Sequence, residues 1–465
     1  MLKDKMLWVY YSDMLKSEYL QCKQEGKEVG TFEQQVEYIG NMPQGKEKED
    51  LARDLMLKME ALPVIPNFDF KEPERYEDIL KTLPTDSKEI FDYDMQSLTE
   101  KISGAWYGRA AGCLLGIPVE GWTREKIKGY AQASGNWPLT DYFSSNVSEL
   151  VKTEFDIHNA DPTTPYDRTV KCWINNVRYF PTDDDTNYTL TALKILERNG
   201  RNFASEDVAE TWIYSIPAFH ACTAERVAYR NLMNGILPPK SGKYLNPYRE
   251  WIGAQIRADF YGYINPGSPK AAAGMAYRDA SVSHTKNGIY GSMLIAAILS
   301  LCVCGDLSMP EIIKKALCQI PAQSRLYAGI RRVLEQFSQK NSYMDVIDNI
   351  HSHYNEKLFD DWCHTVPNAM IVAATLLYYE NDFGKAITNA VLSGFDTDCN
   401  AATVGSVVGM HLGFEGIDKH WTERIEPVLS SSVHGFNRIA LKEAIQETLN
   451  IINERMPNHG AGVKK

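Results

Sequence analysis

Three consecutive aspartates precede an apolar run in residues 181–189, PTDDDTNYT. A carboxylate before the first turn of a helix caps it and interacts favourably with the helix dipole, by a few tenths to about 1 kcal/mol. Capping accounts for one or two of Asp183, Asp184 and Asp185, but three adjacent negative charges also repel each other. A second interpretation is that the three carboxylates bind a cation.

A second acidic pair occurs in residues 393–413, SGFDTDCNAATVGSVVGMHLG. Asp396 and Asp398 are two residues apart, which in a continuous helix would separate them by roughly 200°. At a junction between a loop and a helix, both can turn toward one point. Glycines at 405, 409 and 413 then leave one helix face without side chains, which permits close packing on a neighbouring helix.

The two clusters together place at least five carboxylates at the starts of two apolar helices. If these helix starts meet in the fold, protons or cations must relieve the repulsion between the carboxylates. Ligand sets made only of oxygen suit Mg²⁺, Mn²⁺ or Ca²⁺ better than zinc. Five carboxylates exceed the needs of one magnesium ion, so two bridged ions are expected.

The elements that must position these clusters are mainly helical. Apolar residues recur at spacings of three and four, and alternating strand patterns are scarce, which predicts an all-α fold. Near Leu98 the composition changes from charged to small and glycine-rich. We predict an accessory helical region over 1–97, a compact multi-helix domain over 98–455 and a disordered tail over 456–465.

Composition and charge exclude several classes of protein. The 465 residues carry a net charge of -11 without a basic stripe, which argues against a nucleic-acid partner. The nine cysteines form no CxxC pair, so reduced thiols and a cytoplasmic location without an export signal are expected. The uncharged run 288–305 is long enough to span a membrane, but it stands alone and predicts a buried central helix instead.

Four ordered segments carry a resemblance to a known family. They are GAWYGRAAGCLLGIPVEGW (104–122), TDDDTNYTLTAL (182–193), AYRDASVSHTKNGIYGSMLIAA (276–297) and SGFDTDCNAATVGSVVGM (393–410). Their order and spacing resemble the ADP-ribosylglycohydrolase family, which includes the dinitrogenase-reductase-activating glycohydrolase, over about residues 98 to 450. The resemblance implies an all-α domain with two Mg²⁺ or Mn²⁺ ions that hydrolyses the glycosidic bond at the anomeric carbon of ADP-ribose.

The resemblance also implies a set of metal ligands. The first family motif overlays Asp183, Asp184 and Asp185 followed by Thr186, and a register that starts at Thr182 stays open. The metal ligands expected from both motifs are Asp183, Asp184, Asp185, Asp396, Asp398 and Cys399. Cys399 stands where a ligating threonine is common, and because a thiol binds magnesium poorly, a carbonyl, a water or Asn400 would have to replace it.

The remaining expected roles follow from the same resemblance. Glu120 matches a family glutamate near the metals, whereas Cys113 stands where many members have aspartate. We expect Asp183, Glu120 and Asp398 to be catalytic, with Asp183 or Glu120 taking the proton of the attacking water. The residues expected to bind the substrate are Arg109, Gly112, Gly116, His284, Asn400 and Gly405.

The motifs leave the leaving group open, because family members act on ADP-ribosyl arginine, ADP-ribosyl serine, poly(ADP-ribose) or related small molecules. The departures at Cys113 and Cys399 keep an alternative open, in which the protein binds ADP-ribose or a nucleotide without turnover or is a crystallin-like structural protein. Metal-dependent turnover of an ADP-ribosyl substrate separates these possibilities. The oligomeric state and the role of residues 1–97 are not fixed by the sequence.

Overall fold

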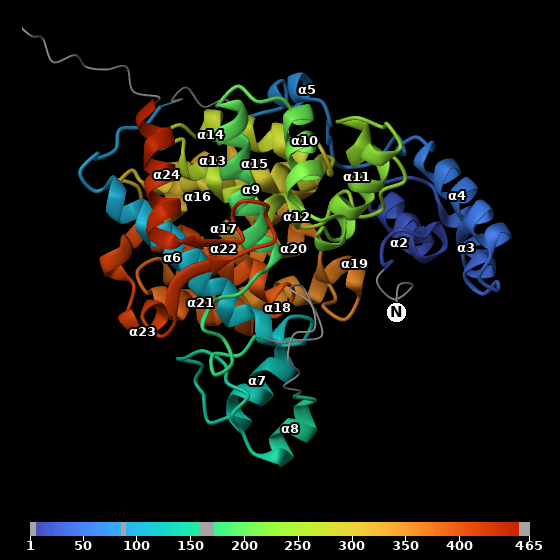
Figure 1. Cartoon of the computed structure of the whole chain (residues 1–465). Helices are drawn as coiled ribbons and strands as arrows, with labels where there is room; N and C mark the ends of the chain where they lie inside the picture. The colour runs from blue at the N-terminus through green and yellow to red at the C-terminus, as the bar shows by residue number, and fades with distance from the viewer. Residues whose placement is uncertain (1–5, 85–89, 158–171, 455–465) are drawn as a thin grey trace, which may run out of the picture.

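Helix α15 (Lys286–Cys302) is the central element of the fold, and all 17 of its residues are buried. The computed structural model describes residues 6–84, 90–157 and 172–454, so the predicted tail over 456–465 lies outside the described residues. Around α15 pack α12 to α14, α16, α17, α20 and α22 (Figure 1). The predicted buried central helix is confirmed, and no helix among the described residues is long and apolar enough to cross a membrane.

The predicted all-α fold is confirmed, because 62% of the structure is helical and its three strands are short. The first helices are α2 (Tyr11–Gln24), α3 (Glu33–Gly40), α4 (Lys46–Glu60), α5 (Tyr76–Leu80), α6 (Leu98–Gly116), α7 (Arg124–Ala133) and α8 (Glu149–Phe155). The middle of the chain forms α9 (Asp184–Asn199), α10 (Ser205–Ser215), α11 (Thr223–Met233), α12 (Gly253–Ile256), α13 (Asp259–Tyr263) and α14 (Pro269–Ala280). After α15 follow α16 (Met309–Leu317), α17 (Arg325–Ser338), α18 (Tyr343–His353), α19 (Phe359–Trp362), α20 (Thr365–Tyr379), α21 (Phe383–Leu392), α22 (Thr397–Leu412), α23 (Lys419–Thr422) and α24 (Leu441–Glu454).

Helices α6 and α22 pack backbone against backbone. A Cβ added at Gly112 of α6 would lie 1.9 Å from the carbonyl oxygen of Ala401, and one at Gly116 would lie 2.4 Å from the Cα of Asp398. The reverse also holds, because a Cβ at Gly405 of α22 would lie 2.2 Å from the carbonyl oxygen of Gly108. Neither helix can carry larger side chains on this face, and the contact fixes the start of α22 on the end of α6.

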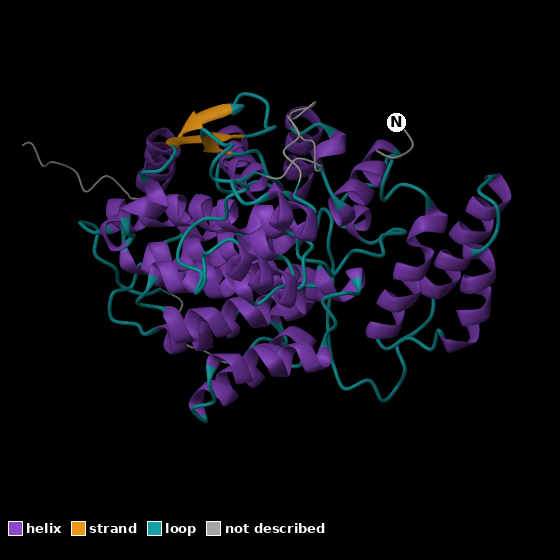
Figure 2. Cartoon of the chain, turned by 90° about the horizontal axis from the view of Figure 1, so that it is seen from below, coloured by secondary structure: helices purple, strands orange, loops and turns teal. Residues whose placement is uncertain are grey.

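A small sheet holds the start of α9. Its strands are β1 (Tyr179–Phe180), β2 (Glu426–Ser430) and β3 (Arg438–Ala440), with β1 parallel to β2 and β2 antiparallel to β3. The strands lie at one edge of the molecule (Figure 2). Thr182 and Ser430 share a hydrogen bond of 2.9 Å between their hydroxyls, and Asn187 accepts one from the backbone N–H of Ser432 at 2.8 Å. The C-terminal strands therefore fix the three aspartates that follow β1.

The N-terminal helices α2, α3 and α4 pack on one another at one side of the molecule (Figure 1). Their connection to the larger helical body is a buried ion-pair network. The Arg249 guanidinium lies 2.8 Å from Glu18 and 2.7 Å from Glu25, and all three side chains are at most 3% exposed. Removing one member of such a buried network leaves an unpaired buried charge, so α2 is held firmly against the rest of the chain.

We expect Gly112→Ala to destabilise the protein by at least about 2 kcal/mol, because the new methyl group would meet backbone atoms that cannot rotate away. Gly129→Ala in α7 is the matched control, since its Cβ would meet the Phe155 ring at an ordinary 3.5 Å. The control should be neutral or slightly stabilising because alanine favours a helix. The free energy of unfolding in urea measures both, and equal values for the two variants would contradict the close packing of α6 on α22.

Candidate metal centre and active-site cavity

The three adjacent aspartates occupy the start of α9. Asp183 is the N-cap, and its carboxylate accepts a hydrogen bond of 3.0 Å from the backbone N–H of Asp185. Asp184 and Asp185 lie in the first turn, and Asp185 is fully buried. Carboxylate oxygens of all three lie within 4.8 Å of one another and of one from Asp398. The hydroxyl of Thr182 instead bonds Ser430, which favours the register that begins at Asp183.

The second acidic pair occupies the start of α22, directly against α6. Asp396 is the N-cap in an extended conformation, and Asp398 lies in the first helical turn, so both carboxylates reach the same cavity. The hydroxyl of Thr397 donates to the carbonyl oxygen of Gly116 at 3.0 Å. Asn368 accepts hydrogen bonds from the backbone N–H of Asp396 and from the side chain of Asn400. The junction between loop and helix therefore brings Asp396 and Asp398 together.

Arg109 is not part of the cavity wall. Its guanidinium is buried and lies 2.8 Å from Asp185 and 2.8 Å from Asp259, and it also donates to the backbone carbonyl of Ile256. These contacts do not fit the expected role as a diphosphate ligand. They instead orient Asp185, because one carboxylate oxygen accepts from Arg109 while the other, Oδ2, has no hydrogen-bond partner among the described residues.

The acidic cluster, which we define as Asp183, Asp184, Asp185, Asp396 and Asp398, is held against strong repulsion. Burial, and next the charge of Glu120, raises the pKa of Asp396 to about 8. Burial also raises the pKa of Asp185 and of Asp398 well above the ordinary range of an aspartate, and neighbouring carboxylates add to both shifts.

Two buried oxygens, Oδ2 of Asp185 and Oδ1 of Asp398, lack a hydrogen-bond partner within the described part of the chain. Buried polar atoms in proteins are normally paired, so these two call for a ligand. Several carboxylates at short range are the donor set that hard divalent cations such as Mg²⁺ and Mn²⁺ take. The residues present therefore fit divalent metal.

Two cysteines adjoin the cluster. The Cys399 sulfur lies within 4.8 Å of carboxylate oxygens of Asp185 and Asp398, and Cys113 is placed similarly against Asp183 and Asp185. Burial, followed by the neighbouring carboxylates, raises the pKa of both thiols. A neutral thiol is a weak donor to a hard cation, so the oxygens of the cluster are the better ligands.

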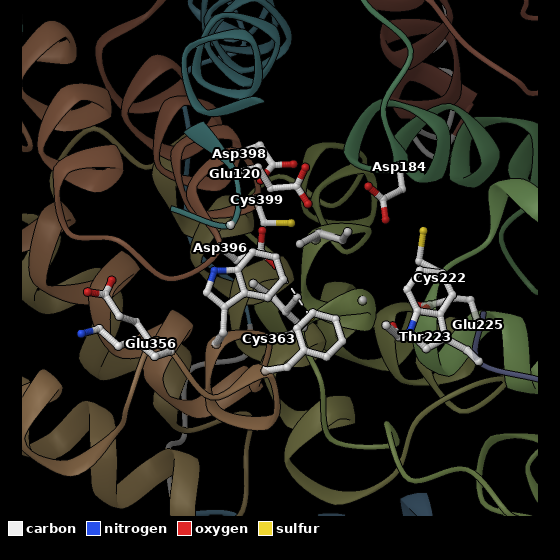
Figure 3. A pocket seen from close by; sticks show the side chains of 18 of the residues that line it. Glu120, Asp184, Cys222, Thr223, Glu225, Glu356, Cys363, Asp396, Asp398 and Cys399 are labelled. Atoms are coloured by element: carbon white, nitrogen blue, oxygen red, sulfur yellow. Dashed lines mark hydrogen bonds between the residues drawn. The ribbon is translucent and has the colours of Figure 1, made fainter. Parts of the chain in front are cut away.

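A cavity of about 460 Å³ opens beside the cluster. Glu120, Asp184, Asp396, Asp398 and Cys399 belong to its wall, whereas Asp183 and Asp185 do not. Figure 3 shows the Asp398 and Asp184 side chains along one side, with Glu356 on one flank and Cys222, Thr223 and Glu225 on the other. A cavity of this volume accommodates a small organic ligand next to the carboxylates.

The other expected substrate residues lie elsewhere. Gly112, Gly116 and Gly405 lie in the contact between α6 and α22, so they position Asp398 and do not form part of the cavity wall. The side chain of Asn400 bonds Asn368, at 2.7 Å. His284 is buried against Ser283, and its Nδ1 lies 3.9 Å from Glu225, behind the wall. These five residues support the site through packing and hydrogen bonds.

Sequence reasoning missed two parts of the cavity wall. Glu225 is buried at the start of α11, where the Arg257 guanidinium lies 2.5 Å away, and burial raises its pKa to about 7. Trp8 belongs to the same wall although it lies more than 200 residues away from Glu225 along the chain. Neither residue belongs to a motif, and only the fold brings them to the cavity.

The chain is similar to known proteins. The ADP-ribosylglycohydrolase family matches residues 94–456, a range that contains the whole acidic cluster. An uncharacterized protein of Archaeoglobus fulgidus is 24% identical over 334 residues, which cover 71% of this chain and 92% of that protein. An ADP-ribosylglycohydrolase-related protein complex of known structure aligns with 17% identity and a TM-score of 0.47, over 78% of this chain and 100% of that chain.

The raised pKa of Asp396 predicts how stability depends on pH without metal. The folded protein holds this proton up to about pH 8, whereas an ordinary aspartate loses it near 3.8, so the folded state binds more protons between these values. The free energy of unfolding should therefore fall as the pH rises through this window. In Asp396→Asn the fall should be smaller, as measured by urea unfolding in EDTA at pH 5 and pH 8. Equal pH dependence in both proteins would contradict the shift.

The contacts of Arg109 predict an effect on metal binding rather than on diphosphate binding. We expect Arg109→Lys to weaken Mg²⁺ and Mn²⁺ binding by about tenfold or more, because lysine cannot hold Asp185 and Asp259 in the same way. Arg178→Lys, in an exposed ion pair with Glu426, is the control and should bind metal normally. Calorimetric titration measures the affinity for metal without ADP-ribose and then the affinity for ADP-ribose in Mg²⁺. Unchanged metal affinity with weaker ADP-ribose binding would restore the diphosphate role.

Proposed function

Because the chain belongs to the ADP-ribosylglycohydrolase family, we propose that it hydrolyses the glycosidic bond at the anomeric ribose carbon of an ADP-ribosylated protein or small molecule. One observation carries the proposal. Carboxylates from α9 and α22, far apart in the sequence, lie within 4.8 Å of one another, and Asp184, Asp396 and Asp398 reach the wall of a cavity that can hold a small ligand.

We propose that the acidic cluster holds two divalent cations, Mg²⁺ or Mn²⁺, with Asp183, Asp184 and Asp185 contributed by α9, and Asp396 and Asp398 by α22. Divalent cations held there would supply the positive charge that polarises a water and fixes the ribose hydroxyls. Arg109 keeps one oxygen of Asp185 occupied and so leaves the other directed at the cluster. The glycine contact with α6 keeps Asp398 in place during the reaction.

Glu120 is the better candidate for the general base. Its carboxylate belongs to the cavity wall beside Asp396 and Asp398 (Figure 3), where it can accept a proton from a water placed against the ribose. Asp183 is the other candidate, but its carboxylate caps α9 through the N–H of Asp185 and is not part of the wall. In this proposal Glu120 moves the proton, while Asp183 and Asp398 hold the metal site.

A second candidate function is binding of ADP-ribose without turnover. The neutral thiols of Cys113 and Cys399 beside the cluster favour it, because they replace oxygen donors expected from the family motif. Both functions need the cavity, but only hydrolysis needs an activated water. Binding of ADP-ribose with no release from any ADP-ribosyl substrate would support the second candidate.

We expect Asp184→Asn and Asp398→Asn to lower metal-dependent hydrolysis at least about 100-fold, because each removes a charge from the metal site. The measurement is release of ADP-ribose from ADP-ribosyl arginine, ADP-ribosyl serine and poly(ADP-ribose), with Mg²⁺, Mn²⁺ or EDTA. Circular dichroism should show nearly unchanged helix content in both variants.

Asp382→Asn is the matched control for these variants. Asp382 caps α21 through the N–H of Lys385, and asparagine caps a helix about as well as aspartate. This variant should keep full activity. Hydrolysis that persists in EDTA, or that survives in Asp398→Asn, would rule out the proposed metal-dependent mechanism.

A further inference from the structure

The segment before α2 reaches the cavity although it lies outside the range that matches the family. The match begins at residue 94, whereas Trp8 forms part of the wall together with Cys222, Thr223 and Glu225 from the start of α11. The cavity is therefore built jointly by the family domain and by the N-terminal region. Part of the wall on this side therefore comes from residues outside the matched range.

Two arginines of α11 contact this segment. The Arg226 guanidinium lies 5.7 Å from the centre of the Trp8 ring and donates to the backbone carbonyls of Ala221 and Phe219. Arg230 lies 4.8 Å from the Tyr11 ring and donates to the backbone carbonyl of Val9 at 3.4 Å. Glu225 and Arg226 are consecutive, so one turn of α11 both lines the cavity and supports the indole.

The backbone at Trp8 is itself unusual. Its φ is 60°, in the left-handed region that bulky residues avoid. Such a conformation persists when the surroundings fix it, and here the following helix α2 is tied to the main body by the buried contacts of Arg249 with Glu18 and Glu25. Trp8 is thus held by the contact of Arg226 with its ring and by the contacts of the segment that follows it.

The neighbours of Trp8 define what the ring can bind. A guanidinium already lies against the ring, so a second cation there would be repelled. Glu225 is already paired with Arg257, so it offers hydrogen-bond acceptance rather than a free negative charge. An aromatic ring beside a carboxylate that can accept suits a neutral, flat heterocycle with an amino group.

The other aromatic residues of the wall are already stacked on each other. Phe359 lies parallel to Trp362 with ring centroids 5.6 Å apart, and its edge contacts Trp251 at 5.0 Å. The indole N–H of Trp362 donates to the backbone carbonyl of Phe395 at 2.7 Å. These two rings therefore already use part of their surfaces in contact with each other.

We propose that Trp8 forms the nucleobase subsite of the cavity, so that the adenine of the ADP-ribosyl substrate stacks on its indole beside Thr223 and Glu225. The inference rests on the proposed function, since it assigns a place to one part of the same substrate. It makes the N-terminal region part of the substrate-binding site. Catalysis at the acidic cluster would not require the indole itself.

The test compares ligands with and without the base. ADP-ribose and ribose 5-phosphate are titrated into the full chain in Mg²⁺, for the wild type, Trp8→Phe and Trp8→Leu. We expect Trp8→Leu to weaken ADP-ribose binding about tenfold and to leave ribose 5-phosphate within about twofold. Trp8→Phe should stay within about threefold for both ligands, because phenylalanine keeps an aromatic face.

Trp137→Leu is the control for loss of an indole, because Trp137 is 43% exposed and does not line the cavity. Equal loss of both ligands in Trp8→Leu, or no loss of ADP-ribose, would overturn the nucleobase subsite while leaving the proposed hydrolase intact. A wild type that binds neither ligand would overturn the proposed function and this inference together. If Trp8→Leu does not fold, a loss of ADP-ribose affinity well beyond threefold in Trp8→Phe, which keeps the stacking face, would also overturn it.

Discussion

The contact between the backbones of α6 and α22 is the constraint on which the rest of the site depends. Because a Cβ at Gly116 would lie 2.4 Å from the Cα of Asp398, the start of α22 can be placed only where α6 ends in glycine. The same helix α6 carries Arg109, which reaches across to Asp185 on α9. One helix thus sets the positions of both halves of the acidic cluster, although the two halves are separated by about half the chain.

This arrangement gathers negative charge that the protein alone balances only in part. Arg109 neutralises part of it. Burial and the neighbouring carboxylates raise the pKa of Asp396, Asp185 and Asp398, which favours their protonated form when no cation is present. A cluster built for folding alone would gain more from apolar residues, since buried charges are costly even when paired. The crowded carboxylates therefore make sense as ligands of divalent cations, whose charge would relieve their repulsion.

The sequence allowed the fold class, the central helix and the acidic motifs to be predicted, because these depend on local patterns. Three to four-residue periodicity identifies a helix, and carboxylates before an apolar run identify its start. The roles of Arg109, Gly112 and Gly405 were predicted less well, because a glycine or an arginine near a motif serves packing and ligand binding equally well. Only the residue that each one contacts distinguishes packing from ligand binding. Those contacts are with Asp259, Ala401 and Gly108, which lie far away in the sequence. The identity of the metal ligands and of the catalytic base stays a prediction.

The cavity wall has its acidic residues in one part of the chain and Trp8 in another. The acidic residues of the wall all lie within the family range, whereas Trp8 comes from outside it. They are Glu120, Asp184, Glu225, Glu356, Asp396 and Asp398. Substitutions in the N-terminal segment can therefore change which part of a substrate binds beside Trp8 without disturbing the carboxylates. The buried ion pairs of Arg249 with Glu18 and Glu25 connect α2, which follows Trp8, to the main body. A region with an accessory composition thus contributes Trp8 to the cavity wall.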